Sequence, residues 1–154
     1  MTHTEYLEQA EAMKARLYRT ALLYLGSESA ALDAVDEAVY KGLRACKKLR
    51  QPEFFATWLT RILINVCNSE LRRRRREIAV DALPETAAEE FDVLPLKEAV
   101  RRLPEELRAV VILRYFSGLT LAETARALNI PAGTVSTCQR RALSLLKLEL
   151  TEEV

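Results

Sequence analysis

Apolar side chains recur every three or four residues along most of this chain, and this period predicts a succession of amphipathic helices. Gly26-Ser27 and Gln51-Pro52 interrupt the pattern in the first half of the chain, and such residues end helices or begin turns. The three long segments that they separate are residues 4–25, 29–49 and 53–76.

The second half of the chain shows the same period in shorter pieces, over residues 96–102 and 105–116. Residues 77–94 contain Pro84 and several acidic side chains without a sustained apolar face, which is typical of a loosely packed linker. The predicted fold class is all-α: two small helical domains, residues 1–76 and 95–154, joined by a flexible acidic linker over residues 77–94.

Residues 119–136 combine the features of a helix-turn-helix. Asn129 stands at the turn, where a left-handed backbone is required, and Pro131 is suited to opening the second helix. Ala125 is small enough to let the two helices approach each other. Two apolar residues fill the angle between them, Ile130 and Val135. Such a second helix, here extending to about residue 150, lies in a DNA major groove, although a plain αα-hairpin is the alternative.

On a helical wheel of about 100° per residue, the polar side chains of this second helix lie on the side that faces away from the apolar Val135. Thr134 stands near the helix start, where its hydroxyl would cap the helix or bind a phosphate. A solvated basic face is the alternative. The candidates for contact with duplex DNA are Thr134, Ser136, Thr137, Arg140 and Arg141.

The predicted helix over residues 53–76 has two unlike faces. A wheel of about 100° per residue groups Phe55, Leu59, Ile62 and Val66, with Trp58 at the border. The other face carries amides, guanidinium groups and a hydroxyl that can bond to bases or phosphates, beside aromatic rings that can stack on exposed bases. The candidates for contact with single-stranded DNA are Phe54, Thr57, Trp58, Arg61, Asn65, Asn68 and Arg72.

An ordinary solvated face would also explain this polar stripe, but five consecutive arginines over residues 72–76 favour phosphate or acidic partners. The predicted helix over residues 29–49 has a stripe that is acidic at its start. It is either a docking face for a basic protein surface or a favourable arrangement for the helix dipole. Its members are Asp33, Asp36, Glu37, Tyr40 and Arg44.

Composition and charge narrow the function mainly by exclusion. The three cysteines and the single histidine form no metal-ligand or disulfide pattern, and no catalytic constellation or glycine-rich phosphate loop is present. We therefore expect no enzyme activity, no metal and no cofactor. Neither a signal peptide nor a membrane-spanning run opens the chain, so a cytoplasmic protein is expected.

The net charge of +1 conceals a division along the chain. Residues 1–76, 77–98 and 99–154 carry net charges of +5, −6 and +2, respectively. Two basic segments joined by an acidic one suggest two units that face nucleic acid.

Over nearly its whole length the chain resembles a bacterial extracytoplasmic-function (ECF) sigma factor, the smallest architecture of the RNA polymerase sigma family. Residues 54–65, FFATWLTRILIN, resemble the F-x-x-W-L-x-R-I-x-x-N helix of that family. The other matching segments are DAVDEAV at 33–39, LPEELR at 103–108, VILRY at 111–115 and IPAGTV at 130–135.

The resemblance implies that residues 1–76 are region 2, which binds core RNA polymerase and the minus-10 element, and that residues 95–154 are region 4, which reads the minus-35 element. It assigns core polymerase binding to Asp33, Asp36, Glu37 and Tyr40, and melting and capture of the minus-10 strand to the polar face of residues 54–72. It also implies an anti-sigma factor partner. Leu49 replaces the usual aromatic residue in the base-capturing loop over residues 47–52, so no residue is assigned to base capture.

Two other functions stay open on the residues alone. A stand-alone helix-turn-helix regulator would dimerise and bind a two-fold operator without polymerase, although a duplex reader has little use for the face around Trp58. A small helical nucleic-acid enzyme would need a metal or acid–base site, which the sequence lacks.

Overall fold

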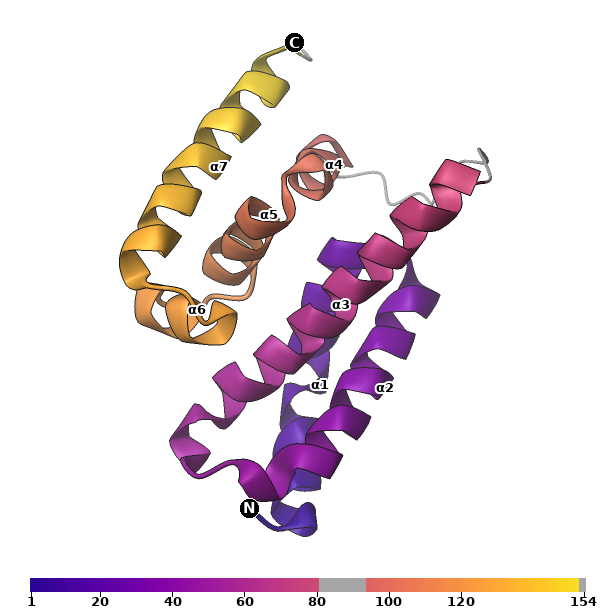
Figure 1. Ribbon diagram of the computed structural model, residues 1–154, viewed down its shortest axis with the longest axis vertical. Coiled ribbons are helices and arrows are strands. Elements are labelled where there is room, and N and C mark those ends of the chain that lie inside the picture. The colour runs from indigo at the N-terminus through magenta and orange to yellow at the C-terminus, as the bar shows by residue number, and fades with distance from the viewer. Residues whose placement is uncertain (81–93, 153–154) are drawn as a thin grey trace. The chain divides into compact units, whose positions relative to one another are not determined.

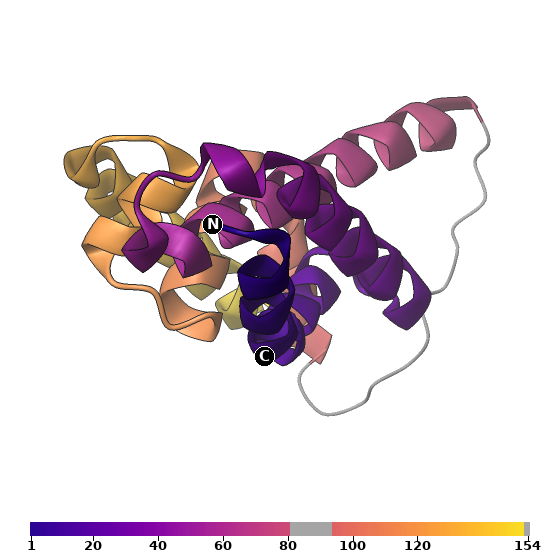
Figure 2. The ribbon, with the colours of Figure 1, turned by 90° about the horizontal axis from the view of Figure 1, so that it is seen from below.

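The computed structural model describes the backbone of residues 1–80 and 94–152 and the side chains of residues 1–77 and 95–147. These described residues form helices and turns without a strand (Figure 1, Figure 2). The chain divides into two compact units, Met1–Ala88 and Glu89–Val154. The predicted all-α class with two helical domains is therefore confirmed.

The first unit is a bundle of three long helices that contact one another in all three pairs (Figure 1). They are α1 (His3–Leu25), α2 (Glu28–Ala45) and α3 (Phe55–Val80). Two short 3₁₀ turns, Cys46–Lys48 and Pro52–Phe54, connect α2 to α3. Gly26 ends α1 with a left-handed φ of 71°, and the Ser27 hydroxyl caps α2 by accepting from the amide of Ala30.

The ring of Tyr6 joins all three helices of this bundle. It is fully buried, and its hydroxyl donates to the carbonyl of Val39 on α2 at 2.6 Å. The ring meets Phe55 and Trp58 of α3 edge-on, with centroids 5.7 and 6.3 Å away. Gly42 of α2 leaves room for it, because a Cβ there would lie 2.9 Å from Tyr6 Cζ and closer still to Oη. Burial raises the pKa of Tyr6 to about 12, so the hydroxyl remains a donor.

In the second unit, the long helix α7 contacts the shorter helices α4, α5 and α6 (Figure 1). The elements of this unit are α4 (Leu94–Arg102), α5 (Glu105–Val111), the π-helical turn η3 (Ile112–Phe116), α6 (Leu121–Leu128) and α7 (Ala132–Glu152). Arg108 is buried beneath the end of α4, and its Nη2 donates to the carbonyls of Arg101 and Leu103 at 2.9 Å each. It thereby satisfies two carbonyls that the end of a helix leaves without helical partners.

The structure corrects the predicted extent of several segments. The helix expected over residues 53–76 begins at Phe55 and continues to Val80, so the first four residues of the expected linker are helical. Arg73 bonds to both Glu70 and Glu77, and these one-turn pairs extend the helix past the arginine run. At the other end of the expected linker, Leu94 already belongs to α4. The predicted linker residues 81–93 lie outside the described residues.

Candidate nucleic-acid interface

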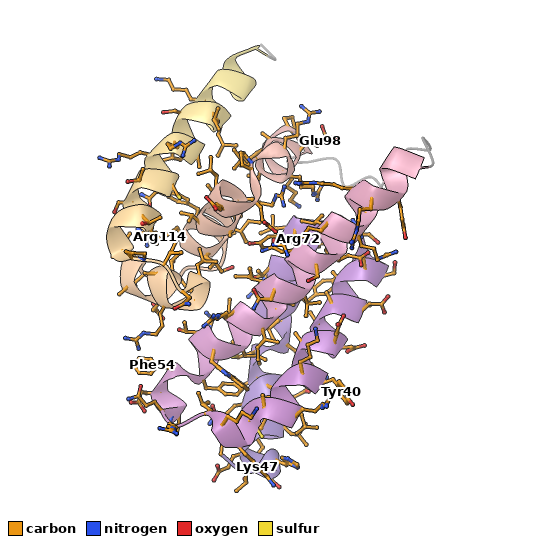
Figure 3. The ribbon with its side chains drawn as sticks, in the orientation of Figure 1. Tyr40, Lys47, Phe54, Arg72, Glu98 and Arg114 are labelled. Carbon is orange, nitrogen blue, oxygen red and sulfur yellow. The ribbon has the colours of Figure 1, made fainter. Side chains whose placement is uncertain are left out.

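The polar face predicted on the third helix runs along α3, from Phe54 at one end to Arg72 toward the other (Figure 3). Arg61, Asn65 and Arg72 are exposed, and the rings of Phe54 and Trp58 are half-buried. Guanidinium groups, an amide and aromatic rings are thus accessible along one side of α3 and of the turn before it, as a surface for bases and phosphates requires.

Two predicted members of this face are less accessible than the wheel suggests. Thr57 is only 7 % exposed, and Thr60 and Ile64, which follow it on the same side of α3, are buried as well. The buried sector of α3 is therefore wider than its aliphatic stripe, and the wheel was wrong about the exposure of Thr57. Asn68 is half-buried, and its Oδ1 has no hydrogen-bond partner among the described residues.

Trp58 belongs partly to the aromatic cluster beneath this face. Its ring lies at 87° to that of Tyr6 and at 40° to that of Phe55, with centroids 6.3 and 6.0 Å away. These contacts fix the indole in place and leave only part of it for stacking on a base. Phe54, by contrast, stands in the turn that leads into α3.

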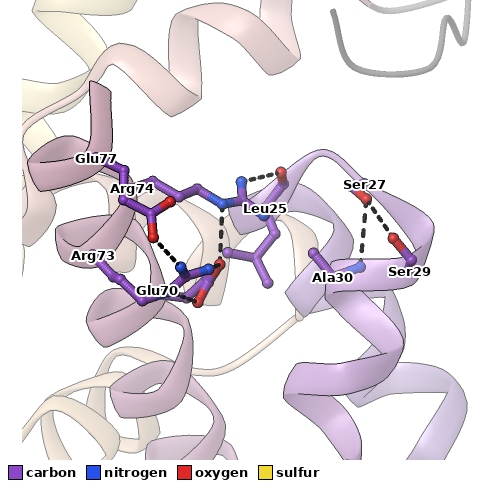
Figure 4. Close-up of polar contacts among 8 residues, drawn as sticks. All are labelled: Leu25, Ser27, Ser29, Ala30, Glu70, Arg73, Arg74 and Glu77. Atoms are coloured by element: carbon purple, nitrogen blue, oxygen red, sulfur yellow. Dashed lines mark hydrogen bonds and ion pairs between the residues drawn. The ribbon is translucent and has the colours of Figure 1, made fainter. Parts of the chain in front are cut away.

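Two of the five consecutive arginines, Arg73 and Arg74, form hydrogen bonds within the first unit (Figure 4). Glu70 accepts a hydrogen bond from Arg73 Nη2 at 2.6 Å and another from Arg74 Nε at 3.3 Å. The bond from Arg73 is the main cause that lowers the pKa of Glu70. Arg74 also donates to the carbonyl of Leu25, the last residue of α1, at 2.9 Å. Of the two kinds of partner expected for this run, phosphates or acidic groups, Arg73 and Arg74 thus have acidic ones within the chain, while Arg75 and Arg76 are exposed.

The acidic stripe predicted on the second helix lies on the surface of α2. Its members Asp33, Asp36, Glu37 and Tyr40 are all exposed, and Tyr40 is labelled in Figure 3. Glu37 pairs with Lys41 at 3.1 Å, and the guanidinium of Arg44 lies 5.8 Å from the centre of the Tyr40 ring.

One exposed neighbour of this acidic stripe was not predicted from the sequence. Leu32 is 54 % exposed and stands one turn before Asp36, which in turn stands one turn before Tyr40. The spacing of four residues was the available signal. The acidic part of the stripe on α2 therefore lies between an exposed leucine and an exposed tyrosine.

The helix-turn-helix forms as predicted at its turn. Asn129 adopts φ 56° and ψ 47°, a left-handed conformation, and the amide of Ile130 donates to the carbonyl of Ala125 at 3.0 Å. Thr120 and Glu123 form a capping box at the start of α6. Ala125, whose small side chain is expected to let the helices approach, is half-buried, and the fully buried residues of α6 are Thr124 and Ala127.

The polar face of α7 presents the predicted duplex-contacting side chains. Thr134, Thr137, Arg140 and Arg141 are exposed, and Ser136 is half-buried. Thr137 Oγ1 donates to the carbonyl of Gly133 at 3.1 Å, which orients that hydroxyl. Thr134 does not cap the helix, because α7 begins at Ala132 and the carbonyl of Pro131 accepts from the amides of Thr134 and Val135. The two arginines are therefore the charged groups of this face.

One contact at this interface could not be expected from the sequence. Arg114 of η3 donates from Nε to Gln139 Oε1 on α7 at 3.1 Å and from Nη1 to the carbonyl of Leu119 at 2.8 Å. The two side chains are 25 residues apart, and no spacing motif connects them.

Among the described residues no group of His, Cys, Asp and Glu is arranged to hold a metal ion. Cys46, Cys67 and Cys138 are buried free thiols, and burial raises the pKa of Cys67 to about 12. No helix in the described part of the chain is long and apolar enough to cross a membrane.

Comparison with known proteins assigns both units. Residues 10–77 match Sigma-70 region 2, and residues 99–148 match Sigma-70, region 4. RNA polymerase sigma factor SigV of Bacillus subtilis is 30 % identical over 145 residues, which are 91 % of this chain and 87 % of SigV. ECF RNA polymerase sigma factor SigM of Mycobacterium tuberculosis is 32 % identical over 139 residues, 86 % of this chain and 71 % of SigM.

Two solved structures share the fold. The sigma factor RpoE, crystallised with the anti-sigma factor NepR from Bartonella quintana, superposes with a TM-score of 0.81 at 22 % identity, covering 96 % of this chain and 97 % of RpoE. CnrH, in complex with the cytosolic domain of CnrY, gives a TM-score of 0.75 at 19 % identity, covering 97 % and 89 % of the two chains. With region 2, region 4 and relatives that match most of its length, this chain belongs to the ECF sigma factors of the sigma-70 family.

Proposed function

We propose that the two units divide the work of a sigma factor, with the first unit opening the minus-10 element and the second reading the minus-35 element. The protein is a transcription initiation factor that directs RNA polymerase to promoters. The observation that carries the division is the presence of two differently built faces in one chain. The α7 face has arginines for a duplex, and the α3 face has aromatic rings for unpaired bases. Residues 1–76 and 95–154 are the proposed working units, with 77–94 between them.

The second unit would anchor the polymerase on double-stranded DNA. Arg140 and Arg141 are exposed on one side of α7, beside Thr137, and a helix held by a left-handed turn enters a major groove with its N-terminal side chains. Ser136 and Thr134 complete the set that contacts bases or phosphates.

The first unit would hold the melted strand of the minus-10 element. Unstacking a base costs a few kcal/mol, and each aromatic stack returns about 1–3 kcal/mol. Phe54 and the accessible part of Trp58 supply the stacking, while Arg61, Asn65 and Arg72 supply bonds to bases and phosphates. Thr57 and Asn68 border this face.

The acidic stripe of α2 would bind a basic surface of core RNA polymerase. Asp33, Asp36 and Glu37 provide the charge, and Tyr40 adds an exposed aromatic ring. We also propose an anti-sigma factor partner, since the similar sigma factor RpoE was crystallised with the anti-sigma factor NepR. The protein would add sequence specificity to the polymerase in the bacterial cytoplasm without catalysing a reaction itself.

Gel filtration with sigma-free core RNA polymerase tests the proposal, followed by promoter binding of the reconstituted holoenzyme. Arg140→Ala is expected to weaken minus-35 binding about tenfold and to leave core binding unchanged, because Arg140 lies on the DNA face only. Asp36→Arg is expected to abolish co-elution by reversing the charge of the α2 stripe.

Arg16→Ala and Glu8→Arg, at exposed positions of α1, are the matched controls. The division of labour is wrong if Arg140→Ala and Asp36→Arg affect both assays alike. Tight binding of a two-fold operator by a dimer, without polymerase, would support a stand-alone regulator instead.

A further inference from the structure

A polar contact ties the DNA-facing helix α7 to the helix that precedes the motif. The guanidinium of Arg114 donates to Gln139 on α7 and to the carbonyl of Leu119, the residue just before the cap of α6. Figure 3 shows Arg114 beside the N-terminal half of α7. One side chain thus holds α7 and the entrance of α6 at the same time.

This contact fixes which way the amide of Gln139 points. A guanidinium has five N–H donors and no acceptor, so the amide atom that faces Arg114 must be the oxygen. The amide nitrogen, with its two N–H donors, is therefore directed away from Arg114. A glutamine without such a partner would present oxygen and nitrogen alike.

Gln139 stands at the edge of the proposed DNA-contacting face. It is half-buried and precedes the exposed Arg140. At about 100° per residue, it lies about 40° from the buried Val135 and about 60° from Ser136 around the axis of α7. Its amide is thus placed between the core of the unit and the side chains that face outward.

We propose that Gln139 is a specificity-determining residue of the minus-35 interface that offers the duplex a donor only, with Arg114 as its positioning residue. A glutamine that reads adenine uses both amide atoms, accepting from N6 and donating to N7. With its oxygen turned to Arg114, Gln139 loses the paired contact that singles out adenine. Guanine then offers its amide donor two acceptors, N7 and O6, and thymine offers O4, whereas in adenine the N7 acceptor lies beside the N6 donor. The proposal rests on the assignment of the second unit to the minus-35 element.

The test uses the full-length protein with core RNA polymerase and a promoter library that is randomised over the minus-35 element. Gln139→Leu keeps the bulk of the side chain and removes the amide. It is expected to reduce the preference for guanine or thymine at one base pair roughly 2- to 10-fold, with the other positions unchanged. Gln9→Leu, at an exposed position of α1, is the matched control.

Arg114→Met separates positioning from general stabilisation. It frees both amide atoms of Gln139, so the preference at that same base pair is expected to move toward adenine. The double variant is expected to match Gln139→Leu alone. A purely structural arginine would instead lower the affinity for every sequence by the same factor.

The possible outcomes separate a failure of this inference from a failure of the proposed function on which it rests. If the unmodified holoenzyme selects no minus-35 sequence, both the proposed function and this inference are wrong. A selected sequence that Gln139→Leu leaves unchanged would overturn the inference alone. A uniform loss across sequences with a shallower salt dependence would show that Gln139 contacts a phosphate, which also overturns base reading.

Discussion

The two units of this protein hold their helices together by contacts of very different range. In the first unit, the Tyr6 hydroxyl reaches a carbonyl 33 residues away and Arg74 reaches one 49 residues away. In the second unit, Arg108 and Arg114 each bond to a carbonyl five residues away, and Arg114 also reaches Gln139, 25 residues away. The polar contacts that join the helices of the first unit therefore span 33 to 49 residues, whereas those of the second unit span 5 to 25.

The difference has consequences for the two DNA faces. The α3 face rests on an aromatic cluster that reaches into α1 and α2, so a change on either helix can disturb Trp58. The α7 face depends on one turn, with Asn129 in a left-handed conformation and Thr120 capping α6, and on the bonds of Arg114 to Gln139 and Leu119. Substitutions far from the DNA face should therefore matter more in the first unit than in the second.

The largest difference in stability between the two units is expected when one methyl group is added to a helical glycine in each. Gly42→Ala places a Cβ against the buried Tyr6 ring, 2.9 Å from Cζ. Tyr6 cannot yield, because its hydroxyl is bonded to Val39 and its ring is packed on α3. We expect a loss of roughly 1–3 kcal/mol in the free energy of unfolding, measured by urea denaturation.

Gly133→Ala is the matched substitution in α7, where nothing lies within 4 Å of the added Cβ. Because alanine favours a helix, we expect it to be neutral or to stabilise by up to about 1 kcal/mol, as measured by circular dichroism. Trp58 is the sole tryptophan of the chain, so its fluorescence reports on the first unit. Equal effects of the two alanines would contradict the packing of Tyr6 against Gly42.

The next comparison concerns two arginines that bond to carbonyls at helix ends. Arg108 is 4 % exposed and serves two carbonyls in the second unit, whereas the Arg74 side chain is 31 % exposed and serves one in the first. Arg108→Met leaves buried carbonyls unsatisfied and is expected to cost about 1.5–3 kcal/mol.

Arg74→Met is expected to cost about 1 kcal/mol or less, because the Arg74 side chain is partly exposed and bonds to a single carbonyl. Urea denaturation of the two variants, followed by circular dichroism, makes the comparison. A larger loss of stability for Arg74→Met would mean that the separation of the two partners along the chain, and not their burial, determines how much such a contact stabilises the protein.

Local signals made much of the fold predictable from the sequence. Helical periodicity, the residues Gly26-Ser27 and the turn at Asn129 located the helices and the helix-turn-helix, because each acts within a few residues. The extension of α3 to Val80 was missed, since the acidic composition of the linker concealed the pairing of Arg73 with Glu77.

The candidate site was predictable where a helix has one boundary between core and solvent. On α7 the wheel separated Arg140 and Arg141 from Val135 correctly. On α3 it failed at Thr57, because a wheel cannot show how wide the buried sector is. The contact of Arg114 with Gln139 was beyond sequence reasoning, since it depends on how two separate helices meet.

The smallest expected effect is a dependence of stability on pH, which arises from the bonds of Glu70 to Arg73 and Arg74. The hydrogen bond from Arg73 lowers the pKa of Glu70 below its ordinary value of 4.5. A carboxylate whose pKa is lower in the folded state stabilises the protein above the unfolded value, and this contribution is lost as the pH falls through the folded value. The first unit should therefore lose stability below about pH 4.5, as its Trp58 fluorescence reports in urea.

Glu70→Gln isolates that contribution, because the amide keeps the shape of the side chain and cannot ionise. The variant should be less stable than the unmodified protein at neutral pH, and the two curves of stability against pH should converge in acid. Glu11→Gln, which alters an exposed pair with Lys14 at 3.1 Å, is the control, and its curve should stay close to the unmodified one. If the Glu70→Gln curve instead ran parallel to the unmodified one down to low pH, Glu70 would not link Arg73 and Arg74 to the stability of the first unit.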